Sequence, residues 1–132
     1  HSLHAHIYRR PRSSGQRCRG EEIQAAHKIP DGAPKGDTKD VGLDYDDTYT
    51  AAPGPFGEMV RAMQREGHRV YFVTYRGADE FGPVIKVADM LGIAAVATDG
   101  APKMRTMDNL GVSIDIWIDD MPELIFEDQS GV

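Results

Sequence analysis

Hydrophobic residues in the second two thirds of the chain follow two alternating patterns. Short runs rich in β-branched and aromatic residues predict buried strands. These strands are expected at 41–45, 70–73, 93–97 and 114–118. Between them, apolar residues spaced three and four positions apart predict amphipathic helices. These helices are expected at 56–66, 79–91, 101–110 and 122–126.

Strands that alternate with helices of this length imply right-handed crossovers and a parallel sheet. The pattern therefore predicts an α/β fold, specifically a Rossmann-like three-layer sandwich. Its sheet should be mostly parallel and contain four to five strands. All of these elements fall within residues 41–132, which we expect to form the functional domain.

Composition narrows the class of protein without identifying it. The 132 residues, with 40% hydrophobic and 27% charged side chains, suit one globular domain. No apolar run approaches the roughly 20 residues that span a membrane, so we expect no membrane partner. The first residues lack a signal-peptide core and the chain has one cysteine, which is compatible with the cytoplasmic location that we expect. The single cysteine, Cys18, excludes an internal disulfide and a zinc site built from several cysteines.

Charge divides the chain into two parts. Residues 1–40 carry eight Lys and Arg against five Asp and Glu, whereas 41–132 carry seven against sixteen. The first part is also rich in Ser, Gly and Pro and lacks a sustained hydrophobic period. It is expected to be a poorly ordered basic arm with a short helix near 21–27. Such an arm could bind an acidic partner, nucleic acid included, or could be a solvated tail.

Polar residues gather where the predicted strands end. Asp44, Asp46, Asp47 and Thr48 follow the first strand, Thr74 the second, and Asp119 and Asp120 the fourth, while Lys103 lies near the start of the third helix. The carboxyl ends of parallel strands meet at one edge of a sheet, where ligands bind. These side chains should therefore share one site.

The residue types fit metal-assisted phosphate chemistry. Closely packed carboxylates repel one another unless a cation compensates them, and Mg2+ prefers oxygen ligands. One carboxylate can attack a phosphoryl group while a second moves protons. A hydroxyl and an ammonium group can neutralise the phosphoryl oxygens. Taken alone, however, an Asp-x-Asp-x-Thr string is also common in loops and helix caps.

The ordered set resembles the four motifs of the haloacid dehalogenase-like phosphohydrolases. The similarity extends over residues 41–121 and comprises Asp44-x-Asp46-x-Thr48, Thr74, Lys103 and Asp119-Asp120. The resemblance implies that Asp44 is the nucleophile and Asp46 the general acid and base. It also implies that Thr74 and Lys103 hold the phosphoryl group.

By the same resemblance, Mg2+ would bind the Asp44 side chain, the backbone carbonyl of Asp46 and an acid of the Asp119-Asp120 pair, with Asp120 favoured. An acid at position 46 is similar to the phosphatase branch of the family. Thr48 and Arg76 are further candidates for phosphate binding, although for Arg76 an ordinary surface arginine is the favoured alternative.

The short links between motifs leave no room for an inserted cap domain. An uncapped site would accept an exposed phosphate on a macromolecule, or a small phosphate monoester, and a homo-oligomer could supply a lid. One alternative is a related binding or structural module that has lost turnover. A phosphoacceptor receiver domain also combines acids, Thr and Lys, but its acidic pair comes first and its Lys last, unlike the order here.

Overall fold

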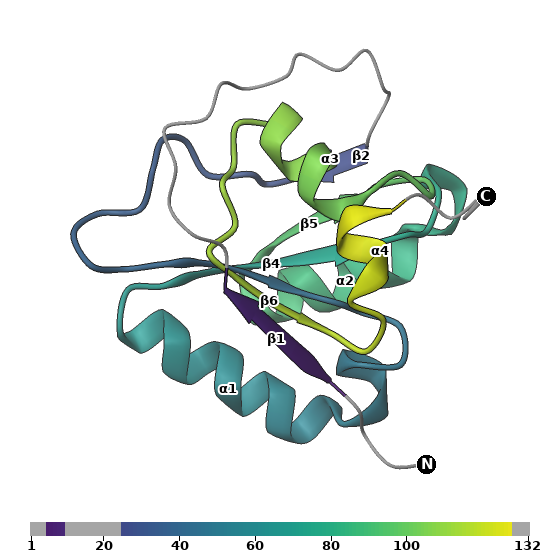
Figure 1. Cartoon of the computed structure of the whole chain (residues 1–132). Helices are drawn as coiled ribbons and strands as arrows, with labels where there is room; N and C mark the ends of the chain where they lie inside the picture. The colour runs from purple at the N-terminus through teal and green to yellow at the C-terminus, as the bar shows by residue number, and fades with distance from the viewer. Residues whose placement is uncertain (1–4, 10–24, 128–132) are drawn as a thin grey trace.

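The computed structural model describes residues 5–9 and 25–127, which form one six-stranded mixed sheet with helices on both faces (Figure 1). The strands are β1 (His6–Arg9), β2 (Ala25–His27), β3 (Asp40–Leu43), β4 (Arg69–Thr74), β5 (Ala94–Ala97) and β6 (Ile116–Asp119). The helices are α1 (Pro53–Arg65), α2 (Gly82–Leu91), α3 (Lys103–Asn109) and α4 (Glu123–Phe126), with short 3-10 turns η1 (Tyr49–Ala51) and η2 (Ala78–Glu80). The predicted α/β class is confirmed.

The four strands predicted from the hydrophobic pattern form the parallel centre of the sheet. The strand order is β1-β6-β3-β4-β5-β2, and the pairs β6–β3, β3–β4 and β4–β5 are parallel. Helix α1 begins at Pro53, three residues earlier than expected, because proline is well suited to the first turn of a helix. Helix α2 begins later than expected, at Gly82, because the chain first makes the turn η2.

Two edge strands correct the prediction for residues 1–40. β1 pairs antiparallel with β6, and β2 pairs antiparallel with β5. The sheet is therefore mixed and has six strands, not four to five, and these parts of the expected arm are ordered. The helix expected near 21–27 is wrong at its described end, since Ala25–His27 is a strand. The rest of that prediction lies outside the described residues.

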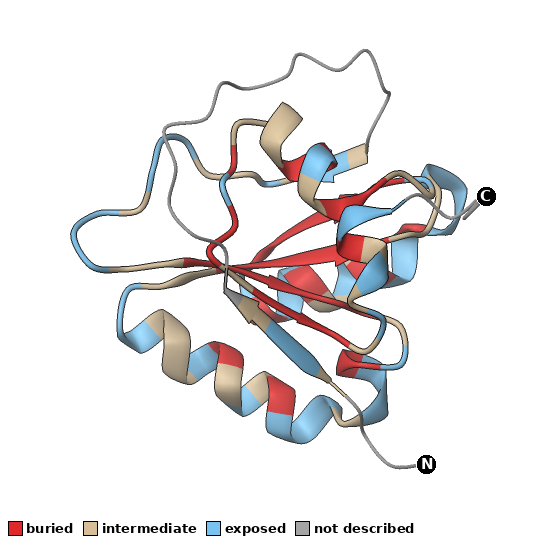
Figure 2. Cartoon of the chain, viewed as in Figure 1, coloured by how far each residue is buried: buried red, intermediate tan, exposed pale blue. Residues whose placement is uncertain are grey.

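Each face of the sheet has its own apolar core. Val41, Leu43 and Phe72 pack with side chains of α1 and α2 on one face. Tyr71 and Trp117 pack on the other face with side chains of α3 and α4. Figure 2 shows the buried residues concentrated along the central strands and on the inner sides of the helices.

The links between the parallel strands are short. Within the continuously described segment 25–127, the link from β3 to β4 contains only η1 and α1, and that from β4 to β5 contains only η2 and α2. Neither link holds an inserted domain, as expected from the motif spacing. No helix among the described residues is long and apolar enough to cross a membrane.

Candidate active site at the carboxyl ends of the strands

The strand order reverses between β3 and β6, at the topological position where open α/β sheets have a crevice. From β3 the chain adds β4 and β5 on one side, and then returns to place β6 on the other. Ligands of open α/β sheets bind at such a reversal, beyond the carboxyl ends of the strands. Asp44 follows β3 directly, and Asp119 is the last residue of β6. The Asp44 backbone N–H donates to the Ile118 carbonyl at 2.9 Å, so the two acids are held on neighbouring strands.

Lys103 joins these two acids. Its Nζ lies 2.8 Å from Asp44 Oδ1 and 2.5 Å from Asp119 Oδ2. All three residues are buried, and Lys103 is only 1% exposed. A buried ammonium group requires close negative partners, because its transfer from water is otherwise strongly unfavourable. The first residue of α3 therefore reaches into the crevice instead of remaining in solvent, as lysine usually does.

Thr48 links Asp44 to Asp120. Its Oγ1 lies 3.0 Å from Asp44 Oδ2 and 3.2 Å from Asp120 Oδ1, and accepts a hydrogen bond from the Asp120 backbone N–H at 3.1 Å. Asp119 is held separately, because its Oδ1 accepts from the Met121 N–H at 3.0 Å. The loops after β3 and β6 are thus tied together by the acids and their neighbouring hydroxyl.

The three acids form a group that suits a divalent cation. Asp44, Asp119 and Asp120 each offer one carboxylate oxygen, and these oxygens all lie within 4.8 Å of one another. Three ionised carboxylates against the single ammonium of Lys103 leave two negative charges uncompensated. An all-oxygen donor set with this excess charge suits a hard divalent cation.

Burial changes the protonation of the acids. Burial raises the pKa of Asp44 from the ordinary 3.8 to about 7, although the nearby charge of Lys103 opposes the rise. Burial also raises the pKa of Asp119, again against the effect of Lys103. Positive charge delivered to this crevice would favour the ionised form of both acids.

A second group of residues lies beside the first. Arg76 grips Asp46 with two hydrogen bonds, from Nε to Oδ2 at 3.0 Å and from Nη2 to Oδ1 at 2.8 Å. Thr74 Oγ1 lies 3.5 Å from Asp46 Oδ2. Hydrogen bonding from Arg76 holds the pKa of Asp46 below its ordinary value. Asp46 is therefore an ionised carboxylate in this arrangement.

The structure brings every residue singled out in the sequence to the same edge of the sheet. Five of them are connected directly through hydrogen bonds: Asp44, Thr48, Lys103, Asp119 and Asp120. Asp46, Thr74 and Arg76 form the adjacent group. Arg76, a candidate for phosphate binding, donates to Asp46 in this arrangement. Asp47 adopts a left-handed backbone conformation, with φ of 62°, and its N–H donates to Thr50 Oγ1.

No protein-family model, curated protein or solved structure matches the chain. The function of the chain therefore has to be inferred from the chemistry and geometry of this site, together with the motif resemblance.

Two aromatic residues that contact the site were not predicted from the sequence. The Tyr45 ring lies under the Arg76 guanidinium, with 5.3 Å between the guanidinium carbon and the ring centroid. The Tyr75 ring lies 5.6 Å from Lys103 Nζ. Both tyrosines are adjacent in sequence to motif residues, which is the signal that could have revealed them. Aromatic faces stabilise the two cations that hold the acids.

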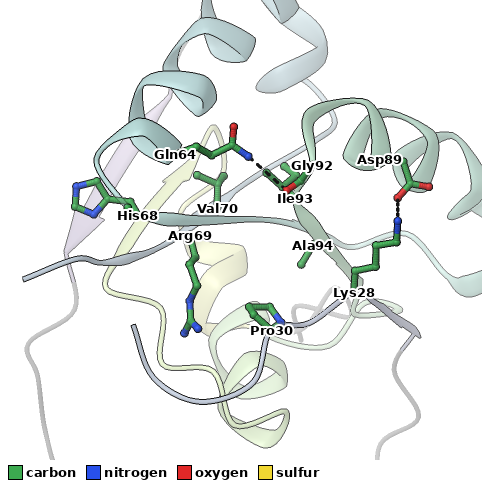
Figure 3. A pocket seen from close by; sticks show the side chains of 11 residues that line it. Lys28, Pro30, Gln64, His68, Arg69, Val70, Asp89, Gly92, Ile93 and Ala94 are labelled. Atoms are coloured by element: carbon green, nitrogen blue, oxygen red, sulfur yellow. Dashed lines mark hydrogen bonds and ion pairs between the residues drawn. The ribbon is translucent and has the colours of Figure 1, made fainter. Parts of the chain in front are cut away.

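A separate hollow of about 390 Å3 lies at the opposite edge, beside the amino ends of β4 and β5 (Figure 3). Its charged residues have partners within the protein. Lys28 pairs with Asp89 at 3.0 Å, and Arg69 makes two hydrogen bonds to the buried Asp40. Gln64 Nε2 donates to the Leu91 carbonyl at 2.9 Å. These contacts explain the charged residues as supports of the fold.

Proposed function

We propose that the protein is a Mg2+-dependent phosphomonoester hydrolase that works through an aspartyl-phosphate on Asp44. The observation that carries the proposal is the position of Asp44 at the crevice between β3 and β6, where Lys103, Thr48, Asp119 and Asp120 converge. The resemblance to the haloacid dehalogenase-like phosphohydrolases assigns the same residues to the same chemistry. It also supports assigning the fold to the Rossmann-like type of that family.

In the first step, a carboxylate oxygen of Asp44 attacks the phosphorus atom of the substrate. A new oxygen–phosphorus bond forms and the ester bond to the leaving group breaks. Asp46, which has first taken up a proton from solvent, donates that proton to the departing oxygen. In the second step Asp46 removes a proton from water, which attacks the phosphorus atom. The Asp44–phosphate bond breaks and inorganic phosphate leaves, so that both acids return to their initial state.

The remaining residues provide positive charge and hydrogen bonds to the transferred group. Lys103 and Thr74 would contact its oxygens, and Thr48 would orient Asp44. Mg2+ would offset the charge of the phosphoryl oxygens. Its ligands would be the Asp44 side chain, the Asp46 backbone carbonyl and one acid of the Asp119-Asp120 pair. Asp120 is favoured as the direct ligand, because Asp119 already accepts from Lys103 and Met121.

A second candidate is a binding or structural module that has lost turnover. It is favoured by one observation, the engagement of both Asp46 oxygens by Arg76. A carboxylate whose two oxygens both accept from a guanidinium takes up a proton less readily, and this opposes the role of Asp46 as a general acid. The two candidates predict the same bound cation but differ in turnover.

The decisive experiment measures phosphate release from aryl phosphates and a panel of phosphomonoesters, with and without Mg2+. Asp44→Asn should abolish turnover and leave the fold intact, because it removes the attacking charge at nearly constant volume. Asp47→Asn is the matched control, since Asp47 lies in the same loop and asparagine tolerates its left-handed backbone. An Asp44→Asn variant that turns over substrate as fast as the wild type would refute the assignment of Asp44 as nucleophile. Cation binding without turnover on any substrate would favour the inactive module.

A further inference from the structure

Arg76 is held from several directions. Two of its nitrogens donate to Asp46, and Nη1 donates to the Glu80 carbonyl at 2.9 Å. Its backbone N–H donates to Thr74 Oγ1 at 3.2 Å. One face of the guanidinium covers the Tyr45 ring. Arg76 therefore connects the loop after β3 with η2, which follows β4.

This geometry leaves the guanidinium poorly placed to bind phosphate. All three of its nitrogens already donate to protein acceptors, and its planar fork matches the two oxygens of one carboxylate. Binding a phosphoryl group with the same Nε–Nη2 fork would require Arg76 to release Asp46. The exchange would free the carboxylate at the moment when its position matters for catalysis.

Asp46 needs such support. Its side chain is 46% exposed, unlike the buried Asp44, and the loops around it carry no cap domain. A carboxylate on an exposed loop has free rotation unless a neighbour restricts it, and misplacing a catalytic group by about 1 Å can reduce the rate about 100-fold. The fork of Arg76 fixes both Asp46 oxygens and turns one of them toward Thr74.

We infer that Arg76 is a positioning residue that orients the Asp46 carboxylate, and not a phosphate-binding residue. The inference rests on the proposed phosphatase function and adds a determinant of its rate. It differs from the phosphate-binding role for which the sequence makes Arg76 a candidate.

The test compares Arg76→Gln, Arg76→Lys and the wild type with an alkyl phosphomonoester, a substrate whose leaving group needs the proton that Asp46 supplies. A positioning role predicts that kcat falls about 10- to 100-fold for Arg76→Gln. KM, and the inhibition constant of inorganic phosphate, should stay within about twofold, because phosphate contacts are unchanged. Arg76→Lys should also be defective, since an ammonium group keeps the charge but lacks the fork. Arg61→Gln, an exposed arginine on α1, is the control.

A double-mutant cycle with Asp46→Asn separates the two roles. If Arg76 acts through Asp46, Arg76→Gln should have little further effect once Asp46 is asparagine. A full effect in that background, or a rise of about tenfold in KM and in the phosphate inhibition constant, would overturn the inference alone. An inactive wild type would instead refute the proposed function, and the inference with it.

Discussion

At the scale of single residues, Asp44 and Lys103 depend on each other for their buried charges. Lys103 places one ammonium between two acids that lie beneath the protein surface. Removing either partner leaves an uncompensated group, whereas adding a cation completes the balance of charge. Asp44, Lys103 and Asp119 are far apart in sequence, but the charge of Lys103 is stabilised by the two acids, and their charges are stabilised by Lys103.

The raised pKa of Asp44 predicts how stability changes with pH when a chelator keeps the protein free of metal. Folded Asp44 binds a proton up to about pH 7, whereas the unfolded side chain releases it near 3.8. The folded state therefore holds more protons in this window, and the free energy of unfolding should fall as pH rises through it. Asp119 should contribute in the same direction.

The Asp44→Asn variant lacks the titrating carboxyl group, so the free energy of unfolding of this variant should depend less on pH. Relative to the variant, the wild type should lose at least about 1 kcal/mol between pH 4.5 and pH 7.5, since one pKa unit corresponds to about 1.4 kcal/mol. Urea unfolding at several pH values measures the difference. Asp47→Asn should keep the wild-type slope, and equal slopes for Asp44→Asn and the wild type would contradict the prediction.

At the scale of secondary structure, close packing of β3 against β6 supports the crevice. Gly42 lies in the middle of β3, where a Cβ atom would approach Trp117 Cε3 to 2.7 Å. Trp117 is 1% exposed and is surrounded by core residues, so it has little room to move. The glycine thus allows the indole of β6 to lie directly over the neighbouring strand.

Gly42→Ala should destabilise the protein by about 2 kcal/mol, as is typical of overpacking a dense core. Gly54→Ala is the matched control, because an added Cβ at Gly54 meets no atom within 4 Å and alanine favours the helix. Thermal and urea unfolding measure both variants. Equal stability of Gly42→Ala and Gly54→Ala would show that Trp117 can adjust.

The secondary structure also shows what the sequence could predict. The four parallel strands were predictable because each is buried and rich in β-branched, aromatic or small apolar residues. β2 has only three residues, Ala25–His27, too few to display a period, and its pairing with β5 is set by tertiary contacts. The acids of the site were predictable from their positions at strand ends. The hydrogen bonds from Arg76 to Asp46 were not predictable, because they depend on the geometry of two side chains that are 30 positions apart in sequence.

At the scale of the whole molecule, the edge that carries the site is strongly acidic. The loops beyond the carboxyl ends of the parallel strands expose Asp47, Asp79, Glu80, Asp99, Glu123 and Glu127. Among the described residues of those segments and the first turn of α3, the positive side chains are Arg76, Lys103 and Arg105, and Arg76 and Lys103 are paired with acids. The field at the site should therefore repel polyanions at low salt.

This charge distribution opposes the possibility that nucleic-acid phosphates are preferred substrates. We expect kcat/KM for a 5′-phosphorylated oligonucleotide to be at least about tenfold below that for 4-nitrophenyl phosphate at 20 mM salt, since a charged cleft can alter association rates by about 10- to 1000-fold. Raising salt to 200 mM, with Mg2+ constant, should reduce the difference in kcat/KM between the two substrates, because the screening length falls to less than about 10 Å. A faster reaction with the oligonucleotide at low salt would instead show that the basic residues of 1–40 outweigh the acidic edge.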